Sequence, residues 1–274
     1  MAIEREIIQF IRRQGLDMSE KTVLYVEEGR VGLLTLNRPN ALNAMDTTML
    51  AELKETLHQV KDSSIDVLIV TGSGKGFSAG GDLKSMLSNT DNSGFEDIMS
   101  NISEIITTLY TLPKLVISAV NGPAAGLGFS LALAADEVIA SEKAVLAMNF
   151  IDISLIPDGA GHFFLKQRLN PVEAKQLIWQ GIKMSAQDAK EKGLVDAIGE
   201  NALDAAKQQA EVWLAKPTKA MIQTKLLYAS LMKDELTEVL AAEKQGQLQM
   251  RQTADHQEGV QAFLEKRKPV FKGE

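Results

Sequence analysis

The feature that most constrains the fold is a repeated order of apolar strand, glycine-rich turn and helix. The apolar segment 66–71 (DVLIVT) predicts a buried strand, and the turn 72–76 that follows it contains three glycines. The segment 115–120 (LVISAV) repeats this order, with glycines near 121–126 and a helix predicted over 127–135. Strands that alternate with helices in this way favour an α/β fold.

The flanking segments extend this pattern into one continuous domain with a mostly helical last third. Apolar periodicity and breakers predict a β-hairpin at 23–36, helices at about 47–61, from Asp82 and at about 95–111, strands near 137–141 and 144–148, and a short strand at 194–198 within the helical remainder. Residues 1–17 have the spacing of an amphipathic helix and form an extension before the hairpin.

Composition excludes several classes of protein. No apolar run approaches the ~20 residues that span a bilayer, and the N-terminus lacks a signal-peptide core, so we expect a cytoplasmic protein without a membrane partner. The absence of cysteine excludes disulfides and thiolate sites, and three dispersed histidines do not predict a metal centre. A net charge of −7 argues against nucleic-acid binding.

The glycine turns and one carboxylate supply the parts of a reactive site. Glycine lets a ligand approach the backbone closely, and N–H groups at a helix start can hold a negative oxygen. Asp158 lies among glycines in the segment 155–161 (LIPDGAG) and is a candidate proton carrier. Each feature has a structural alternative: the turns can serve strand–helix packing, and Pro-Asp-Gly is a common turn sequence.

Two other motifs compete for this region. Residues 76–80 (GFSAG) satisfy the GxSxG pattern, so Ser78 is a candidate hydrolase nucleophile with His162 or His256 as its base. Residues 72–77 (GSGKGF) match neither phosphate-loop pattern in full, which argues against nucleotide binding.

Several motifs in this order resemble the crotonase superfamily, also called the enoyl-CoA hydratase/isomerase family. The resemblance covers the chain from about Val23 to its end. The segments that carry it are LNRPNALNAM (36–45), GFSAGGDL (76–83), NGPAAGLG (121–128), ALAADEVIAS (132–141), LIPDGAG (155–161) and EGVQAFLEKRKPVF (258–271).

The resemblance implies an α/β fold built as a spiral of β-β-α repeats with a C-terminal helical region that mediates trimers. It divides the chain into an extension at 1–22, a core at 23–205 and a helical region at 206–274 that completes the neighbour's CoA site. It also implies an acyl-CoA thioester substrate, no metal or separate cofactor, and a homotrimer or dimer of trimers.

The family's site residues fall on identifiable positions of this sequence. The resemblance places the oxyanion hole on the backbone N–H groups of Gly81 and Leu127. It places Phe263 and Lys266 against CoA bound to a neighbouring subunit. The residues expected along the CoA and pantetheine path are Ser78, Ala79, Gly80, Asp82 and Leu83.

Departures from the hydratase pattern narrow the expected activity. Hydratases of the family use two glutamates, and this chain has Ser130 and Phe150 at those positions, while Glu142 and Asp152 fall out of register. Asp158 occupies the position of the single acid of the isomerase branch. An apolar pocket that includes Phe150 would raise the pKa of this acid and exclude water.

The sequence therefore predicts an acyl-CoA isomerase that moves a double bond from the 3,4 to the 2,3 position, or rearranges a related ring-derived thioester. Two alternatives stay open: an enoyl-CoA hydratase with an unusual base, and a non-catalytic acyl-CoA-binding paralogue. Asp136 is expected to pair structurally, His162 to have a plain helical role, and Trp179 and Trp213 to pack in the core or at an interface.

Overall fold

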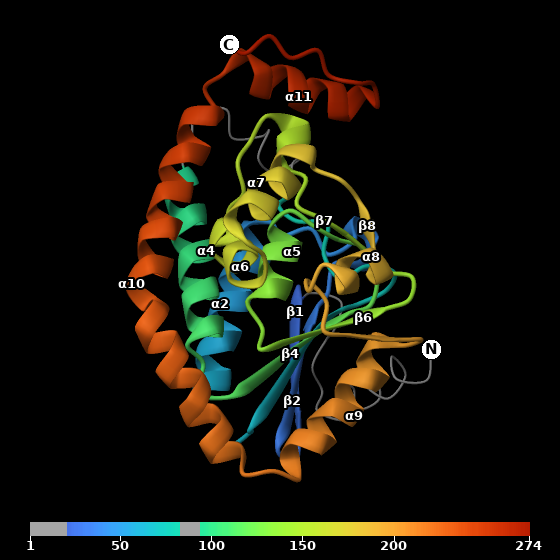
Figure 1. Cartoon of the computed structure of the whole chain (residues 1–274), viewed down its shortest axis with the longest axis vertical. Coiled ribbons are helices and arrows are strands. Elements are labelled where there is room, and N and C mark those ends of the chain that lie inside the picture. Colours follow the sequence, from blue (N-terminus) through green and yellow to red (C-terminus); the bar gives the residue numbers. More distant parts are fainter. Residues whose placement is uncertain (1–20, 83–93) are drawn as a thin grey trace.

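The computed structural model describes residues 21–82 and 94–274. The helix predicted at 1–17 lies outside the described residues. The helix predicted to begin at Asp82 also lies outside them, except for Asp82. The centre of the molecule is a six-stranded sheet in the order β1-β2-β3-β4-β6-β9 (Figure 1). Its strands are β1 (Val23–Glu28), β2 (Val31–Leu36), β3 (Val67–Gly72), β4 (Leu115–Val120), β6 (Glu137–Ser141) and β9 (Ala197–Gly199).

The first two strands form the predicted antiparallel hairpin, and every later neighbour in this sheet is parallel. Burial on both faces explains the continuous apolar runs of β3 and β4. Side chains alternate between the faces, so Leu68 and Val70 belong to one core cluster while Val67 and Ile69 belong to the other.

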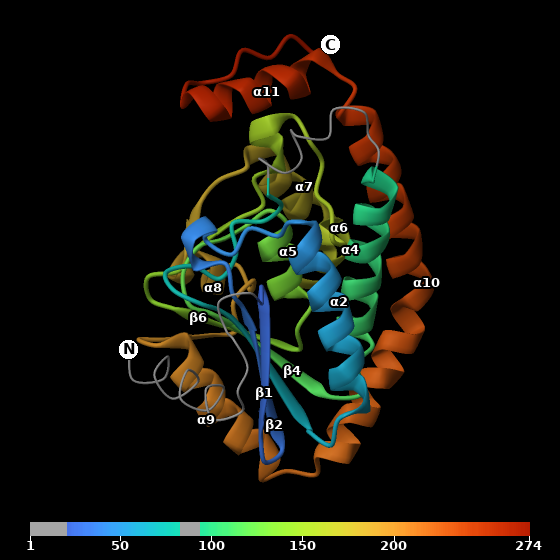
Figure 2. The ribbon, with the colours of Figure 1, turned by 180° about the vertical axis from the view of Figure 1, so that it is seen from behind.

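Helices cover both faces of the sheet. The helices α2 (Thr47–Asp62), α4 (Phe95–Tyr110) and α10 (Thr218–Met250) lie on one side, and α9 (Ala202–Leu214) packs on the other (Figures 1 and 2). Helix α10 runs along almost the whole length of the molecule and contacts both α4 and α6 (Gly161–Arg168).

A small second sheet and short helices complete the core beside the carboxyl ends of the parallel strands. The sheet contains β5 (Ala124–Ala125), β7 (Val145–Ala147) and β8 (Met184–Ser185). The other elements are η1 (Pro39–Ala41), α5 (Leu127–Leu133), η2 (Phe150–Ile153), α7 (Pro171–Gln180), α8 (Ala186–Glu191) and α11 (Ala254–Glu265).

The α/β class and most of the predicted helices and strands are confirmed. Strand β8 was missed because two residues carry no periodicity, and β9 begins at Ala197 rather than at residue 194. Trp213 is buried against the sheet, whereas Trp179 is 64% exposed in this chain and is not a core residue. The predicted boundary between 205 and 206 falls inside α9.

Asp136 has the structural role that its sequence context predicted. Its carboxylate accepts a 2.7 Å hydrogen bond from the Val116 N–H and pairs at 2.8 Å with Lys225 of α10. This contact ties the long helix to β4. No helix within 21–82 and 94–274 is long and apolar enough to cross a membrane.

Candidate active site

The sheet brings the two glycine-rich turns together. Strands β3 and β4 are parallel neighbours, with Thr71 opposite Ala119, so both turns leave the same edge of the sheet. The turns then pair with each other: the Ser78 N–H donates to the Pro123 carbonyl at 3.1 Å, and the Ala125 N–H donates to the Ser78 carbonyl at 2.9 Å. This pairing sets the position of the start of α5 relative to residues 78–82.

The backbone N–H of Gly81 points away from Met45, the residue with which Gly81 forms a parallel β-bridge. Met45 exchanges hydrogen bonds with the residues on either side, accepting from the Asp82 N–H at 3.0 Å and donating to the Gly80 carbonyl at 2.7 Å. The N–H of Gly81 is therefore left over, and it donates to no other residue within the described ranges. Gly81 is partly exposed, so this donor is available to a ligand.

The N–H of Leu127 is a second free donor. Leu127 is the first residue of α5, where an N–H has no partner within the helix, and it donates to no other residue in the part of the chain that the structure describes. A Cβ built on Gly80 would lie 3.4 Å from the Leu127 nitrogen, which places the two turns in close contact beside these donors. Two adjacent free N–H groups can stabilise an oxyanion.

The backbone of Asp158 is held against α5. Its carbonyl accepts a 2.8 Å hydrogen bond from the Ser130 hydroxyl and a 3.2 Å hydrogen bond from the Gly161 N–H. The next residue, Gly159, has φ +63°, and a Cβ there would lie 2.6 Å from Leu127 Cδ1. Ser130 thus positions the turn, and the only polar group it offers is a hydroxyl already committed to that turn.

The carboxyl group of Asp158 has the environment of a proton carrier. Its Oδ1 atom is buried and has no hydrogen-bond partner among residues 21–82 and 94–274, although Asp158 as a whole is partly exposed. Burial raises the pKa of Asp158 to about 8, and the nearby negative charge of Glu243 adds to this increase. A carboxyl group with a pKa near neutrality can both accept and return a proton.

Phe150 lies at the entrance to α5, as the predicted apolar pocket requires. Phe150 is 9% exposed. A Cβ built on Gly126 would lie 3.5 Å from the nearest carbon of the Phe150 ring. Gly126 has φ +52° and immediately precedes the free N–H of Leu127. An aromatic ring here leaves no carboxylate at the position of the second hydratase glutamate.

Glu243 was missed by sequence analysis. It lies on α10, more than 80 residues after Asp158, and is 2% exposed. The signal that points to it is a polar residue within the apolar stripe of α10, since the buried residues Leu236, Leu240, Glu243 and Gln247 recur at helical spacing. His162 was expected to have a plain helical role, but its Nδ1 lies 2.7 Å from Glu243 Oε1.

The serine hydrolase alternative is not supported. Ser78 is fully buried, and its hydroxyl donates to the Asn43 carbonyl at 2.8 Å and accepts from the Gly80 N–H at 3.2 Å. The two candidate bases are occupied elsewhere, because His162 contacts Glu243 and His256 lies 2.7 Å from the Ile153 carbonyl. The side chain of Ser78 holds the turn together and is not free to contact CoA.

The other residues predicted along the CoA path differ in exposure. Ala79 is exposed, Gly80 is buried, and Asp82 pairs with Arg38 at 2.9 Å; Leu83 lies outside the described residues. Arg38 also pairs with Asp46 at 3.1 Å, so it ties this path to the start of α2. Within the described residues, no group of three potential ligands could hold a metal ion.

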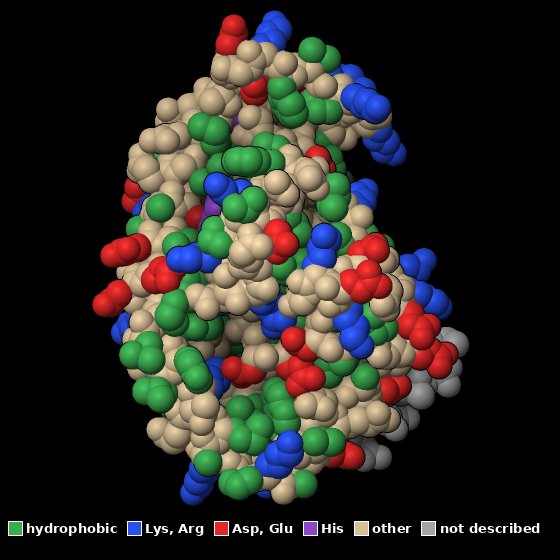
Figure 3. Space-filling view, in the orientation of Figure 1, with side chains coloured by type: hydrophobic (Ala, Val, Ile, Leu, Met, Phe, Trp, Pro, Cys, Tyr) green, Lys and Arg blue, Asp and Glu red, His purple; other side chains and the backbone are tan. Residues whose placement is uncertain are grey.

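The predicted CoA-contacting residues at the C-terminus are exposed. Phe263 is 58% exposed, and Lys266 ends α11 with φ +55°. In Figure 3, Lys and Arg side chains gather at the free end of the lobe formed by α11 and the tail after it. The fold of one chain thus leaves both residues available to a ligand or a neighbouring subunit.

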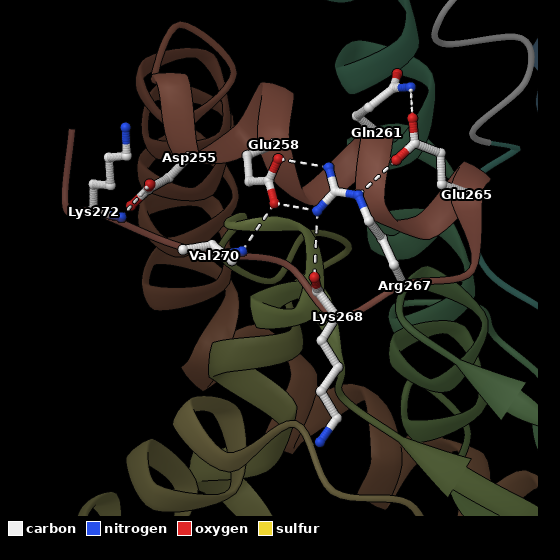
Figure 4. A network of polar contacts seen from close by, with 8 residues as sticks. All are labelled: Asp255, Glu258, Gln261, Glu265, Arg267, Lys268, Val270 and Lys272. Atoms are coloured by element: carbon white, nitrogen blue, oxygen red, sulfur yellow. Dashed lines mark hydrogen bonds and ion pairs between the residues drawn. The ribbon is translucent and has the colours of Figure 1, made fainter.

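A polar network folds the tail back along α11 (Figure 4). Arg267 pairs with Glu258 and Glu265. Its hydrogen bond holds the pKa of Glu258 below the usual range, and hydrogen bonds from Gln261 and then from Arg267 lower the pKa of Glu265. Asp255 accepts hydrogen bonds from the N–H groups of Lys272 and Gly273 at 2.7 Å and 2.8 Å. Arg267 is therefore engaged within the lobe, unlike its neighbour Lys266.

The model of the enoyl-CoA hydratase/isomerase family matches residues 27–274. The chain belongs to this family. Its fold is the crotonase fold that the sequence motifs predicted.

Relatives of the chain in the enoyl-CoA hydratase/isomerase family match over almost their whole length. The Bacillus subtilis protein YhaR, named for the same family, is 47% identical over 250 residues, covering 91% of this chain and 98% of the relative. The 1,2-epoxyphenylacetyl-CoA isomerase of Escherichia coli is 38% identical over 264 residues, covering 93% and 100%. The crystal structure of an enoyl-CoA hydratase from Mycobacterium avium subsp. paratuberculosis matches with a TM-score of 0.82 at 29% identity, covering 92% and 99%.

Proposed function

We propose that the protein is an acyl-CoA isomerase that converts 3-enoyl-CoA to 2-enoyl-CoA, or rearranges a related ring-derived thioester. The observation that carries the proposal is the Asp158 carboxyl group, which has a raised pKa and an oxygen without a hydrogen-bond partner among the described residues, in a chain that lacks both hydratase glutamates. Those positions hold Ser130 and Phe150. One carboxyl group suffices to move a proton between two carbons of the same substrate.

In this mechanism the thioester carbonyl oxygen lies between the N–H groups of Gly81 and Leu127. Asp158 in its charged form removes a proton from C2, and the electron pair of that C–H bond becomes part of an enolate conjugated with the 3,4 double bond. The two N–H groups stabilise the enolate oxygen. Asp158 then returns the proton at C4, so that the double bond lies between C2 and C3 and the enzyme is restored.

The names of the relatives do not decide between isomerisation and hydration, and several of them are named hydratases. The Escherichia coli relative is named an isomerase, whereas another relative from that organism, 33% identical over 263 residues, is named 2,3-dehydroadipyl-CoA hydratase. Hydration needs a carboxylate that positions water. The apolar contact of Phe150 with the turn at Gly126 argues against water at that place.

The proposal extends to the CoA portion of the substrate. CoA passes Ala79 and Gly80, and its phosphates meet Lys266, with Phe263, from a neighbouring subunit of a trimer or of a dimer of trimers. Exposure of Phe263 and Lys266 supports this arrangement. A cytoplasmic location, and the absence of any cofactor besides the CoA of the substrate, also remain predictions.

Purified protein should isomerise a 3-enoyl-CoA and add no water to a 2-enoyl-CoA. The products are read by mass and by the position of the double bond, because isomerisation leaves the mass unchanged and hydration adds one water. Hydration of the 2-enoyl thioester would decide for a hydratase. Tight binding of both thioesters without any conversion would decide for a non-catalytic acyl-CoA-binding protein.

The isomerisation rate should rise with pH up to about pH 8. Asp158 must be charged to remove the first proton, and its pKa of about 8 means that it is mostly protonated at neutral pH. We therefore expect kcat/KM to increase about tenfold per pH unit below that value and to level off above it. A profile that is already flat from about pH 6 upward would mean that a carboxyl group with an ordinary pKa is the base.

A further inference from the structure

Three hydrogen-bond donors around the Asp158 turn converge on the carboxylate of Glu243. The Ala160 N–H donates to Glu243 Oε2 at 2.7 Å, the His162 N–H donates to Oε1 at 3.1 Å, and His162 Nδ1 lies 2.7 Å from Oε1. All three contacts join α10 to the two residues that follow Gly159 and Gly161 in the chain. Glu243 is 2% exposed, so water does not compete for these contacts.

These contacts meet a need that the turn cannot meet itself. The first N–H groups of a helix have no partner within the helix. Ala160, the residue just before α6, has no side-chain oxygen that could accept from them. Ala160 also has φ +60°, a left-handed conformation that is unfavourable for a residue with a side chain. A carboxylate supplied by α10 compensates for both defects, because it accepts the free N–H groups and holds the turn in place.

A second side chain of α10 holds the other end of the turn. The Gln247 side-chain amide donates to the Ile156 carbonyl, and Gly246 lets Ile156 pack directly against the helix. Helix α10 therefore contacts the chain on both sides of Asp158, while no donor in the described part of the chain reaches the Asp158 carboxyl oxygen Oδ1.

We infer that Glu243 is a positioning residue, which fixes the turn that carries Asp158 and keeps a negative charge close to its carboxyl group. The inference rests on the proposed function in that Asp158 is taken as the proton carrier. It adds a residue from a distant helix whose charge adjusts the proton affinity of that carrier without contact with the substrate.

The surrounding charges make Glu243 the group to test. Within the described residues, its charge is the one that raises the pKa of Asp158 besides burial. His162 on α6 faces Glu243. In the described ranges, the other ion pairs between α10 and its neighbours are Lys166–Glu235 to α6, Lys244–Glu96 to α4 and Lys225–Asp136 to the residue just before β6. None of these other pairs contributes to the pKa of Asp158.

The test compares Glu243→Gln with Glu235→Gln, which removes one negative charge from the same helix and also breaks a contact to α6. The Asp158 carboxyl is titrated directly by difference infrared spectroscopy, with Asp158→Asn as the blank. Glu243→Gln should lower the titration midpoint by about half a pH unit or more, because a like charge is removed, and it should lower kcat about tenfold or more as the turn loosens. Glu235→Gln should leave the midpoint and kcat within about twofold of wild type.

An unchanged Asp158 midpoint in folded Glu243→Gln would overturn the inference, as would an equal shift in Glu235→Gln. Should Glu243→Gln fail to fold, His162→Ala removes a partly exposed imidazole and leaves the charge of Glu243 in place. It should decrease kcat without lowering the midpoint, and a lowered midpoint would contradict the inference. The titration needs no substrate, so a shift seen without isomerase activity would reject the proposed reaction and retain the role of Glu243.

Discussion

Asp158→Asn should lower kcat for isomerisation by about 10³-fold or more while leaving CoA thioester binding within about threefold. The substitution keeps the shape of the side chain and the hydrogen bonds of the Asp158 carbonyl to Ser130 and Gly161, but an amide cannot accept and return a proton. Single-turnover kinetics with a 3-enoyl-CoA and calorimetric titration with a non-reactive thioester measure the two effects separately.

The matched control is Asp152→Asn, because Asp152 is a second acid six residues earlier in the chain and is exposed. The Asp152→Asn variant should have the kcat of wild type.

Stability provides a further check on Asp158→Asn. The folded-state pKa of Asp158 is raised, so its burial disfavours folding increasingly as pH rises from about 4 through 8. The Asn variant should therefore unfold at a higher temperature than wild type near pH 9; near-normal turnover by this variant would reject Asp158 as the proton carrier.

Gly80→Ala should decrease kcat/KM by about 10²-fold or more and also lower the unfolding temperature. Gly80 has φ +94°, and a Cβ there would lie 2.7 Å from the Ala125 carbonyl oxygen, which is backbone and cannot move aside alone. The turn 78–82 must then shift away from α5. The N–H groups of Gly81 and Leu127 can then no longer both donate to one substrate oxygen. Misplacing one oxyanion donor commonly costs 10²- to 10³-fold in rate.

Gly29→Ala separates backbone strain from the clash. Gly29 has φ +60° in the hairpin turn, and nothing lies within 4 Å of a Cβ built there. This variant carries the strain of a left-handed alanine, about 1 kcal/mol, and should turn over like wild type. If Gly80→Ala kept the activity of Gly29→Ala, the carbonyl oxygen would not bind between the two turns.

Much of the fold follows from local pattern. Continuous apolar runs predicted β3 and β4, and regular apolar spacing predicted α2 and α4, because these elements are long enough to show a period. Strand β8 has two residues and shows none. Trp179 was expected to pack in the core or at an interface because of its size, but only tertiary placement decides which face of α7 meets the core.

The candidate site also has parts that the sequence predicted and parts that only the fold shows. Gly81, Leu127 and Asp158 stand in motifs that resemble those of the family, and the resemblance assigned their expected roles. The same motif reasoning placed Ser78 among the residues that contact the ligand. In the fold, pairing of the two turns buries Ser78 and commits its hydroxyl to Asn43.

The amino-acid sequence by itself determined the α/β class, the family and the acids that are missing at 130 and 150, because these depend on residue identity and on spacing along the chain. Only the tertiary structure decided that no donor within the described residues reaches Asp158 Oδ1 and that Glu243 lies close to the Asp158 turn. A pKa depends on burial and on charges close in space. The charge that matters here comes from a helix more than 80 residues away in the sequence, where no local pattern connects it to Asp158.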